Sequence, residues 1–149
     1  TAKVNLPCQI LELQSLPAIL SQTTFNPHLK TVFIWEGVTQ YITREAVAQV
    51  LSYIGNLETG SVVLFTYVLR SILDRSDPNG IKMMEWLAAQ KVTWLFGLDP
   101  DEVSAFIKSF RLKLVEDMGI NDFQKRYIEP TGRNMVLIDA EHSVQAKVI

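Results

Sequence analysis

Two short apolar runs dominate the hydrophobic pattern of the chain. The first covers residues 32–35 (VFIW) and stops at Glu36-Gly37, and the second covers residues 61–68 (SVVLFTYV). Both runs are rich in β-branched and aromatic residues and are as long as a typical strand, so they predict strands that are buried on both faces. Weaker patterns predict further strands at residues 2–6, at 112–116 and in the tail that begins at Asn134.

Helical spacing of apolar residues separates these runs. Val47, Val50, Leu51 and Ile54 mark one face of a helix for which Thr43 is a suitable N-cap. Residues 99–102 (DPDE) predict the N-cap, the first helical position and the capping box of another helix. We expect other helices at 10–20, with an interruption at Pro17, at 81–92 and, as a helix or loop, at 123–128; residues 71–80 (SILDRSDPNG) predict a turn.

Strands that alternate with helices at this pitch predict βα units around a mostly parallel sheet. With 149 residues, the chain is expected to form a single α/β domain with a sizeable core. A net charge of -2 without a block of like charges gives no indication of nucleic-acid or membrane binding. Because Cys8 is alone, no internal disulfide can form, which favours a reducing, cytoplasmic compartment.

The carboxylate that ends the first apolar run is the clearest candidate for a functional side chain. Glu is almost never fully buried unless it is paired, so Glu36 is out of place as core packing. In open α/β sheets, ligands bind just beyond the carboxyl ends of the parallel strands, which is where Glu36 would project. A solvated loop residue or a charge at a helix start is the alternative interpretation.

Common catalytic motifs do not decide the function. The seven glycines form neither a GxGxxG nor a phosphate loop, and His28 and His142 have no Cys or His at ligand spacing, so we expect no metal site. Glu141-His142 fits a general-base pair, but a surface dipeptide near the terminus is the preferred interpretation. The Met and aromatic residues between Met83 and Phe96 fit core packing or a ligand pocket. Motifs alone therefore leave the function open.

Five segments in this order resemble the leucine carboxyl methyltransferase family. They are TVFIWEGVTQYITREAV, GSVVLFTYV, FGLDPDEVSAFI, LKLVEDMG and RYIEPTGR. Within the family, the chain is most similar to the bacterial branch of polyketide-type O-methyltransferases, from about Val4 to the end. These are class I enzymes that use S-adenosyl-L-methionine and have a seven-stranded sheet. The resemblance implies the C-terminal part of that Rossmann-like sheet, about strands three to seven, with flanking helices.

The resemblance also implies positions for the cofactor S-adenosyl-L-methionine. Asn5 and Leu6 would lie beside the adenine, at a place where the family usually has Asp. Glu36, with Gly37 next to it, matches the acidic residue after the fourth strand, near the sulfonium or the ribose. Tyr41 would lie at the mouth of the acceptor pocket.

The acceptor side is expected to extend over the connection at residues 69–96. This long connection leaves the sheet at its ligand-binding edge and carries Met84 and Trp94, whose apolar side chains suit a small-molecule pocket. Tyr127 is expected on the same side. No catalytic residue can be named, because an acceptor carboxylate needs no general base and the base that an acceptor hydroxyl needs is not evident.

In the family, the glycine-rich cofactor turn lies on the first two strands, upstream of any segment that this chain contains. We therefore expect one incomplete methyltransferase domain over residues 1–149, inactive alone, with an N-terminal half or a second chain as partner. The complete enzyme would transfer a methyl group to a small-molecule or peptide acceptor. The alternative is a non-catalytic module that binds a partner or forms a homo-oligomer through an open sheet edge.

Overall fold

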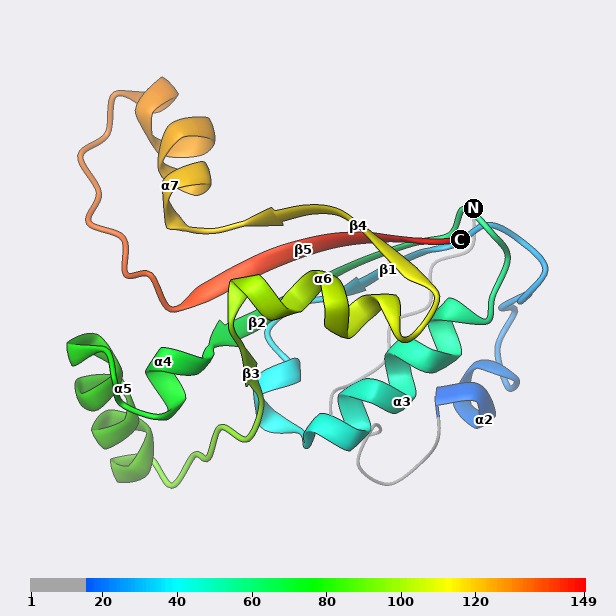
Figure 1. Cartoon of the computed structure of the whole chain (residues 1–149), viewed down its shortest axis with the longest axis horizontal. Coiled ribbons are helices and arrows are strands. Elements are labelled where there is room, and N and C mark those ends of the chain that lie inside the picture. Colours follow the sequence, from blue (N-terminus) through cyan, green and yellow to red (C-terminus); the bar gives the residue numbers. More distant parts are fainter. Residues whose placement is uncertain (1–15) are drawn as a thin grey trace.

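A mixed β-sheet forms the centre of the computed structural model, which describes residues 16–149 (Figure 1). Its main strands are β1 (Val32–Trp35), β2 (Val62–Leu69), β4 (Leu112–Met118) and β5 (Glu141–Val148), in the order β1-β2-β5-β4. The short β3 (Gly97–Leu98) pairs in parallel with the last two residues of β2. The α/β class expected from the sequence is confirmed.

The last strand makes the sheet less parallel than the alternation of elements predicts. β1 pairs with β2 in parallel, but β5 lies between β2 and β4 and is antiparallel to both. The connection at residues 119–140 leaves β4 and rejoins β5 at the same end of the sheet, so β5 runs back along β4 in the reverse direction. A β-bulge at residues 114–116 interrupts the register of β4 with β5.

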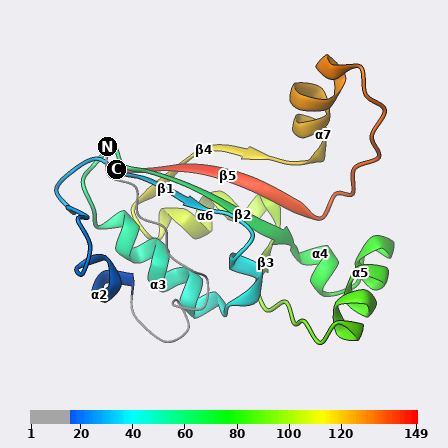
Figure 2. The same ribbon diagram turned by 180° about the vertical axis from the view of Figure 1, so that it is seen from behind.

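Two amphipathic helices cover one face of this sheet. α3 (Arg44–Gly55) begins as expected, because the Thr43 side chain accepts a hydrogen bond from the Ala46 amide. It buries its apolar face, including Leu51, against the sheet, and α6 (Pro100–Lys108) buries Val103 and Ile107. Figure 2 shows the same arrangement from behind.

The remaining helical elements are short, apart from α5, and several differ from the predicted boundaries. They are α2 (Leu16–Leu20), η1 (Thr39–Tyr41), α4 (Arg70–Leu73), α5 (Pro78–Ala89), α7 (Ile120–Phe123), η2 (Gln124–Ile128) and η3 (Glu129–Thr131). The predicted turn at 71–80 is wrong at both ends, because α4 continues directly from β2 and Pro78 begins α5. Pro17 lies in the first described turn of α2, where its missing amide is tolerated, while the strand predicted at 2–6 and the rest of the helix predicted at 10–20 lie outside the described residues.

The capping box predicted at residues 99–102 does not form. Asp99 occupies the N-cap position of α6, but its side chain makes no bond to the helix and instead accepts a hydrogen bond from Arg70 Nε at 2.7 Å. Glu102 also pairs with the guanidinium of Arg70. The start of α6 is therefore tied to the end of β2, since one arginine competes successfully with the local backbone amides.

The face of the sheet opposite α3 is open along β1, so burial on both faces was a wrong prediction for this strand. Val32 and Ile34 are 62% and 73% exposed, whereas Trp35 is buried. Among residues 16–149, β1 pairs only with β2 and has a free edge. For β2 the prediction of an interior strand is confirmed, because it lies between β1 and β5.

Two helical lobes project beyond the carboxyl ends of β2 and β4 (Figure 1). One contains α4 and α5, and the other contains α7 and the turns that follow it. Residues 134–138, which were predicted as part of the last strand, form the irregular return from the second lobe to β5. No helix within residues 16–149 has the length and apolar character needed to cross a membrane.

The contact between α3 and the turn before β4 gives a stability prediction. A Cβ added at Gly55 would lie 1.7 Å from the backbone oxygen of Phe110, so Gly55→Ala must displace α3 or the turn. We expect a loss of about 1–3 kcal/mol in the free energy of unfolding, the usual range for overpacking. Ser52→Ala, on the exposed face of the same helix, is the control and should stay within about 0.5 kcal/mol of wild type in urea titrations. A Gly55→Ala chain as stable as the control would contradict this contact.

Candidate functional site

A polar corner follows β1 at the carboxyl end of the sheet. Gly37 takes a left-handed conformation, φ +66°, and its amide donates to Thr66 Oγ1 at 2.9 Å. The Thr39 hydroxyl donates to the Thr66 carbonyl at 2.6 Å. These two bonds tie the corner to β2 and leave the Glu36 side chain exposed at the end of its strand.

A hollow of about 260 Å³ lies beside this corner on the open face of the sheet. It is lined by Glu36 and Ile34 from β1 and its end, by Leu64 from β2, and by Glu116 and Met118 from β4. Glu36 therefore lines a hollow rather than projecting from an isolated loop. This geometry is compatible with the ligand-binding interpretation, although the exposure of Glu36 also fits a solvated residue.

The structure brings together only some of the predicted site residues. Tyr41 and Trp94 pack edge to face, with ring centroids 6.5 Å apart, because the Leu95 amide donates to the Gln40 carbonyl at 2.6 Å. Met84 is half-buried on α5 and Tyr127 is exposed on η2, so these two lie on different lobes. Asn5 and Leu6 lie outside the described residues.

Polar atoms without partners are concentrated around the same corner. Trp35 Nε1, Gln40 Oε1 and Trp94 Nε1 are buried and have no hydrogen-bond partner within residues 16–149. A buried polar group without a partner is uncommon in a native protein and needs an explanation. A bound molecule or a further segment of protein beside the corner would supply one.

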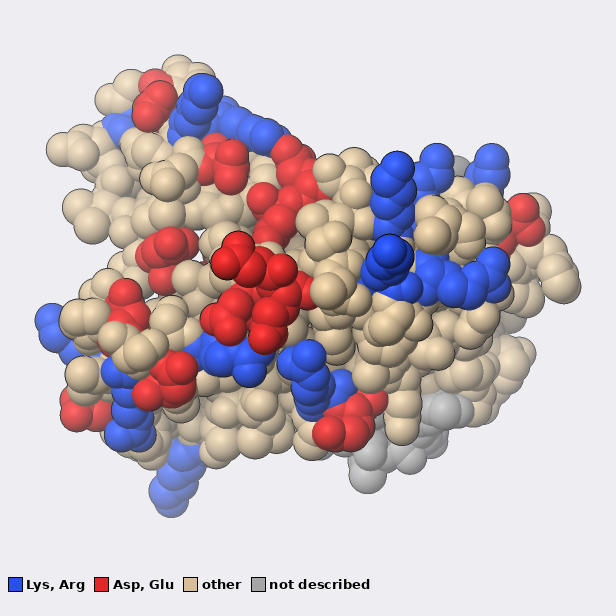
Figure 3. All heavy atoms as spheres, viewed as in Figure 1, with Lys and Arg blue, Asp and Glu red and all other residues tan. Residues whose placement is uncertain are grey.

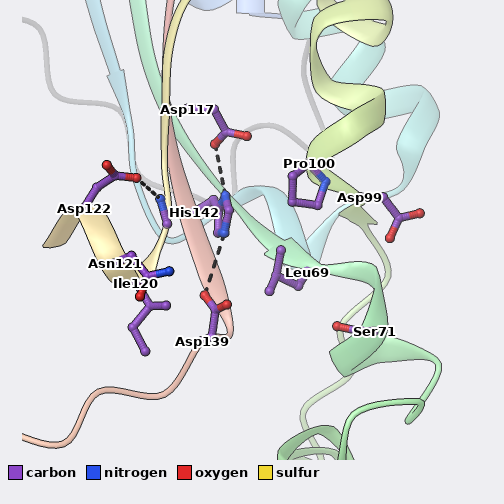
Figure 4. A pocket seen from close by; sticks show the side chains of 11 residues that line it. Leu69, Ser71, Asp99, Pro100, Asp117, Ile120, Asn121, Asp122, Asp139 and His142 are labelled. Carbon is purple, nitrogen blue, oxygen red and sulfur yellow. Dashed lines mark hydrogen bonds and ion pairs between the residues drawn. The ribbon is translucent and has the colours of Figure 1, made fainter. Parts of the chain in front are cut away.

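A second cluster of functional side chains lies at the ends of β2, β4 and β5. Tyr67 Oη is 2.9 Å from Asp117 Oδ2 and 3.1 Å from His142 Nδ1, and His142 Nδ1 is 3.2 Å from Asp117 Oδ1. On its other side, His142 Nε2 is 3.7 Å from Asp139 Oδ1 (Figure 4). The surface-dipeptide interpretation was therefore wrong for His142, whose side chain is only 13% exposed, while Glu141 does point to solvent.

The pKa shifts and hydrogen-bond partners in this cluster indicate which atoms carry protons. Burial, and then the hydrogen bond to Asp117, raise the pKa of Tyr67 far above its usual value, so its hydroxyl stays protonated and donates to that carboxylate. The hydrogen bond to Asp117 also raises the pKa of His142, although desolvation acts against it. Nδ1 of His142 faces two oxygen acceptors, so we assign its proton there in the neutral ring, with the lone pair on Nε2.

A pocket of about 370 Å³ opens in front of this ring, and we call it the histidine pocket. Its acidic lining comes from Asp99, Asp117, Asp122 and Asp139, together with His142 itself. Acidic atoms gather around the hollow at the left of the space-filling view (Figure 3). Gly119 also lines the pocket, and a Cβ added there would lie 2.5 Å from Nε2, so the ring position requires glycine.

Sequence reasoning missed this cluster because its members are far apart in the chain. Tyr67, Asp117 and His142 meet only because β5 pairs with both β2 and β4. The alternation of the tail did contain a signal: Val144, Ala146 and Val148 are buried, so His142, two residues earlier, belongs to the same face. That signal predicts an inward histidine but does not identify its partners.

The proton assignment predicts how a single substitution acts on His142. Asp117→Asn removes the main cause of its raised pKa, so that pKa should fall, as measured by NMR titration of the ring nitrogens. The pKa of His142 in the folded chain lies above the unfolded value of about 6.5. Its stabilising contribution is therefore complete below that value and is lost as the pH rises through the folded-state pKa. The signal of exposed His28 is the internal control, and an unchanged His142 titration would contradict the assignment.

Comparison with known structures shows the fold. A DUF574 family protein from Streptomyces avermitilis aligns with a TM-score of 0.62 and 14% identity, covering 98% of this chain and 54% of that one. PKMT2 from Rickettsia typhi aligns with a TM-score of 0.52 and 7% identity, covering 84% and 37%. Magnesium protoporphyrin IX methyltransferase from Synechocystis, solved with bound SAH, aligns with a TM-score of 0.49 and 7% identity, covering 85% and 47%. The chain thus spans about half the length, or less, of these proteins.

Sequence comparison adds the family. No curated protein matches the chain. The model of the leucine carboxyl methyltransferase family matches residues 3–55, the segment that includes β1, the polar corner and α3. The sheet formed by β1, β2, β5 and β4, with its flanking helices, has the same fold as about half of the DUF574 family protein. The resemblance to the leucine carboxyl methyltransferase family is thereby confirmed, through residues 3–55, on a fold of the class I methyltransferase type.

Proposed function

We propose that this chain is the C-terminal portion of an S-adenosyl-L-methionine-dependent O-methyltransferase, which methylates a carboxylate or hydroxyl of a small molecule or peptide. The observation that carries the proposal is the place of the family match. Residues 3–55 include the polar corner at the carboxyl end of β1, where ligands bind in open α/β sheets.

The corner fits the proposed cofactor. Glu36 is exposed, and the position of a Cβ on Gly37 has no atom within 4 Å, so a cationic ligand can approach both residues. We propose that Glu36 and Gly37 contact the cofactor, together with Asn5 and Leu6. When bound, S-adenosyl-L-methionine supplies the methyl group from its sulfonium. The carboxylate of Glu36 would attract the cation, and the left-handed turn at Gly37 holds that carboxylate at the edge of the sheet.

The acceptor side of the proposed site uses the lobes beyond the sheet. Tyr41 and Trp94 are linked to the corner, and Met84 on α5 belongs to the connection that leaves the end of β2. Tyr127 would contribute from the other lobe. If both lobes contribute residues in this way, the acceptor would bind between the lobe of α4 and α5 and the lobe of α7 (Figure 1).

The proposed partner is an N-terminal half or a second chain that provides the glycine-rich cofactor turn. The edge of β1 that has no partner among residues 16–149 and the exposed Val32 and Ile34 support this proposal, since an open apolar edge is usually covered in a native protein. The same edge supports the second candidate function, a non-catalytic module that binds a partner or a second copy. We further propose a cytoplasmic location, supported by the single Cys8.

The first prediction of this proposal concerns the chain alone. Without a glycine-rich turn, the 149-residue chain should bind S-adenosyl-L-methionine more weakly than micromolar in titration calorimetry. A micromolar dissociation constant corresponds to about 8 kcal/mol of binding free energy. Affinity of that order would show that the chain holds the whole cofactor site and needs no partner.

The second prediction concerns Glu36 after the partner segment has been restored. Glu36→Ala should weaken cofactor binding by about 1.5–3 kcal/mol, the usual loss for a hydrogen bond that involves a charged group. Glu58→Ala is the matched control, because Glu58 is also exposed but precedes the amino end of β2. Equal dissociation constants for the two variants, measured by calorimetry, would identify Glu36 as a solvated loop residue.

A further inference from the structure

We propose that His142 is the general base of the reaction and that the acceptor is therefore an alcohol or phenol bound in the histidine pocket. This inference rests on the proposed methyltransferase function and narrows its substrate class. The histidine pocket has a volume of about 370 Å³, within the range of small-molecule sites. His142 presents its ring to this pocket from the start of β5 (Figure 4).

The surroundings of the ring orient it as a base. Asp117 and Tyr67 both contact Nδ1, at 3.2 and 3.1 Å, so the proton of the neutral imidazole is held on that side. The opposite nitrogen, Nε2, is left to accept a proton from a bound hydroxyl. A carboxylate that fixes the tautomer of a histidine in this way is the usual arrangement for a general base.

The charge around the pocket selects the acceptor. Asp117, Asp122 and Asp139 line it, and no Lys or Arg is among its described lining residues. A fourth carboxylate, Asp99, is paired with Arg70 and contributes less. An acceptor carboxylate would meet three like charges, which disfavours its binding. A neutral hydroxyl meets no such repulsion, and its deprotonation requires the base that the pocket contains.

The histidine pocket and the polar corner lie at the same end of β2, on opposite faces of the sheet. Gly37 bonds to Thr66, and the next residue, Tyr67, bonds to His142. The backbones of the corner and of the base are two strand spacings, or about 10 Å, apart, but Glu36 lies beside the open face of the sheet and His142 lies on the opposite face, with the buried Val144. An acceptor that is anchored near the ring therefore reaches the corner only around the carboxyl end of β2. Within residues 16–149, no group of three His, Cys, Asp or Glu side chains has a geometry that could hold a metal ion.

The step proposed for His142 balances in atoms and electrons. The acceptor O–H proton passes to Nε2, and a lone pair of the acceptor oxygen forms the new C–O bond with the methyl carbon. The bonding pair of the broken C–S bond remains on sulfur, which becomes a neutral thioether. The imidazolium then returns its proton to water. Asp117, Asp122 and Asp139 stabilise that imidazolium while it exists.

The first test uses the 149-residue chain and needs no turnover. Titration with phenol should shift the NMR signals of the His142 ring and leave those of His28 in place, whereas titration with benzoate should shift neither. The ring nitrogen shifts should also show a protonated Nδ1 and an unprotonated Nε2 at a pH above the His142 pKa. Equal responses to phenol and benzoate, no response to phenol, or a proton on Nε2 would overturn the inference.

The second test uses the complete enzyme. With a phenolic or alcoholic acceptor, His142→Gln should lower kcat by about 10²- to 10⁴-fold, the usual contribution of a general base, while cofactor affinity stays unchanged. His28→Gln is the control and should keep the wild-type kcat. Because base catalysis needs the neutral ring, wild-type kcat/KM should rise as the pH passes the His142 pKa. Asp117→Asn should move that rise to lower pH, as its loss lowers this pKa, a readout that a purely structural role would not change.

A further variant covers the case in which His142→Gln does not fold. Gly119→Ala keeps Tyr67, Asp117 and His142 but forces the ring to move, so kcat should fall while cofactor affinity remains. Full activity of a folded His142→Gln or Gly119→Ala enzyme toward a hydroxyl would overturn this inference and leave the proposed function intact. A wild-type enzyme that neither binds the cofactor nor methylates any acceptor would instead overturn the proposed function, whatever the phenol titration shows.

Discussion

The pairing of β5 with two neighbours is the constraint on which the rest of the structure depends. By entering the sheet between β2 and β4, this strand joins the first part of the described chain to the last. It also brings Tyr67, Asp117 and His142 within hydrogen-bond distance, although they come from three strands. Since backbone pairing fixes which side chains are opposite each other, the cluster is as rigid as the sheet itself.

The His142 cluster and the corner after β1 differ in how completely their polar groups are satisfied. In the His142 cluster, the tyrosine, aspartate and histidine satisfy one another and leave one nitrogen toward the pocket. Around the corner after β1, the side chains of Gln40 and Trp94 keep buried polar atoms without a described partner, and β1 itself has a free edge. The His142 cluster is therefore preorganised, while the corner after β1 has buried polar groups that a ligand or another segment can satisfy.

The histidine pocket lies outside the segment that matches the family, so the family match does not define the acceptor that the pocket would bind. The family match concerns residues 3–55, whereas the pocket is built entirely from residues after that segment. A name that refers to carboxyl methylation therefore says little about what this pocket accepts, because fold and family do not determine the chemistry of a site. Here the electrostatics favour a neutral acceptor, and that conclusion depends only on the charges of Asp117, Asp122 and Asp139.

The sequence by itself determined the elements whose signals are local. Thr43 caps α3, the run at 62–69 forms an interior strand, and Glu36 follows the carboxyl end of β1, because periodicity, capping chemistry and apolar runs act over a few neighbouring residues. Tertiary structure decided what depends on distant partners. It placed β5 antiparallel between β2 and β4, left one face of β1 open, and drew Asp99 away from its helix to Arg70. It also buried and oriented the ring of His142, since the partners that orient it are 25 and 75 residues away in the chain.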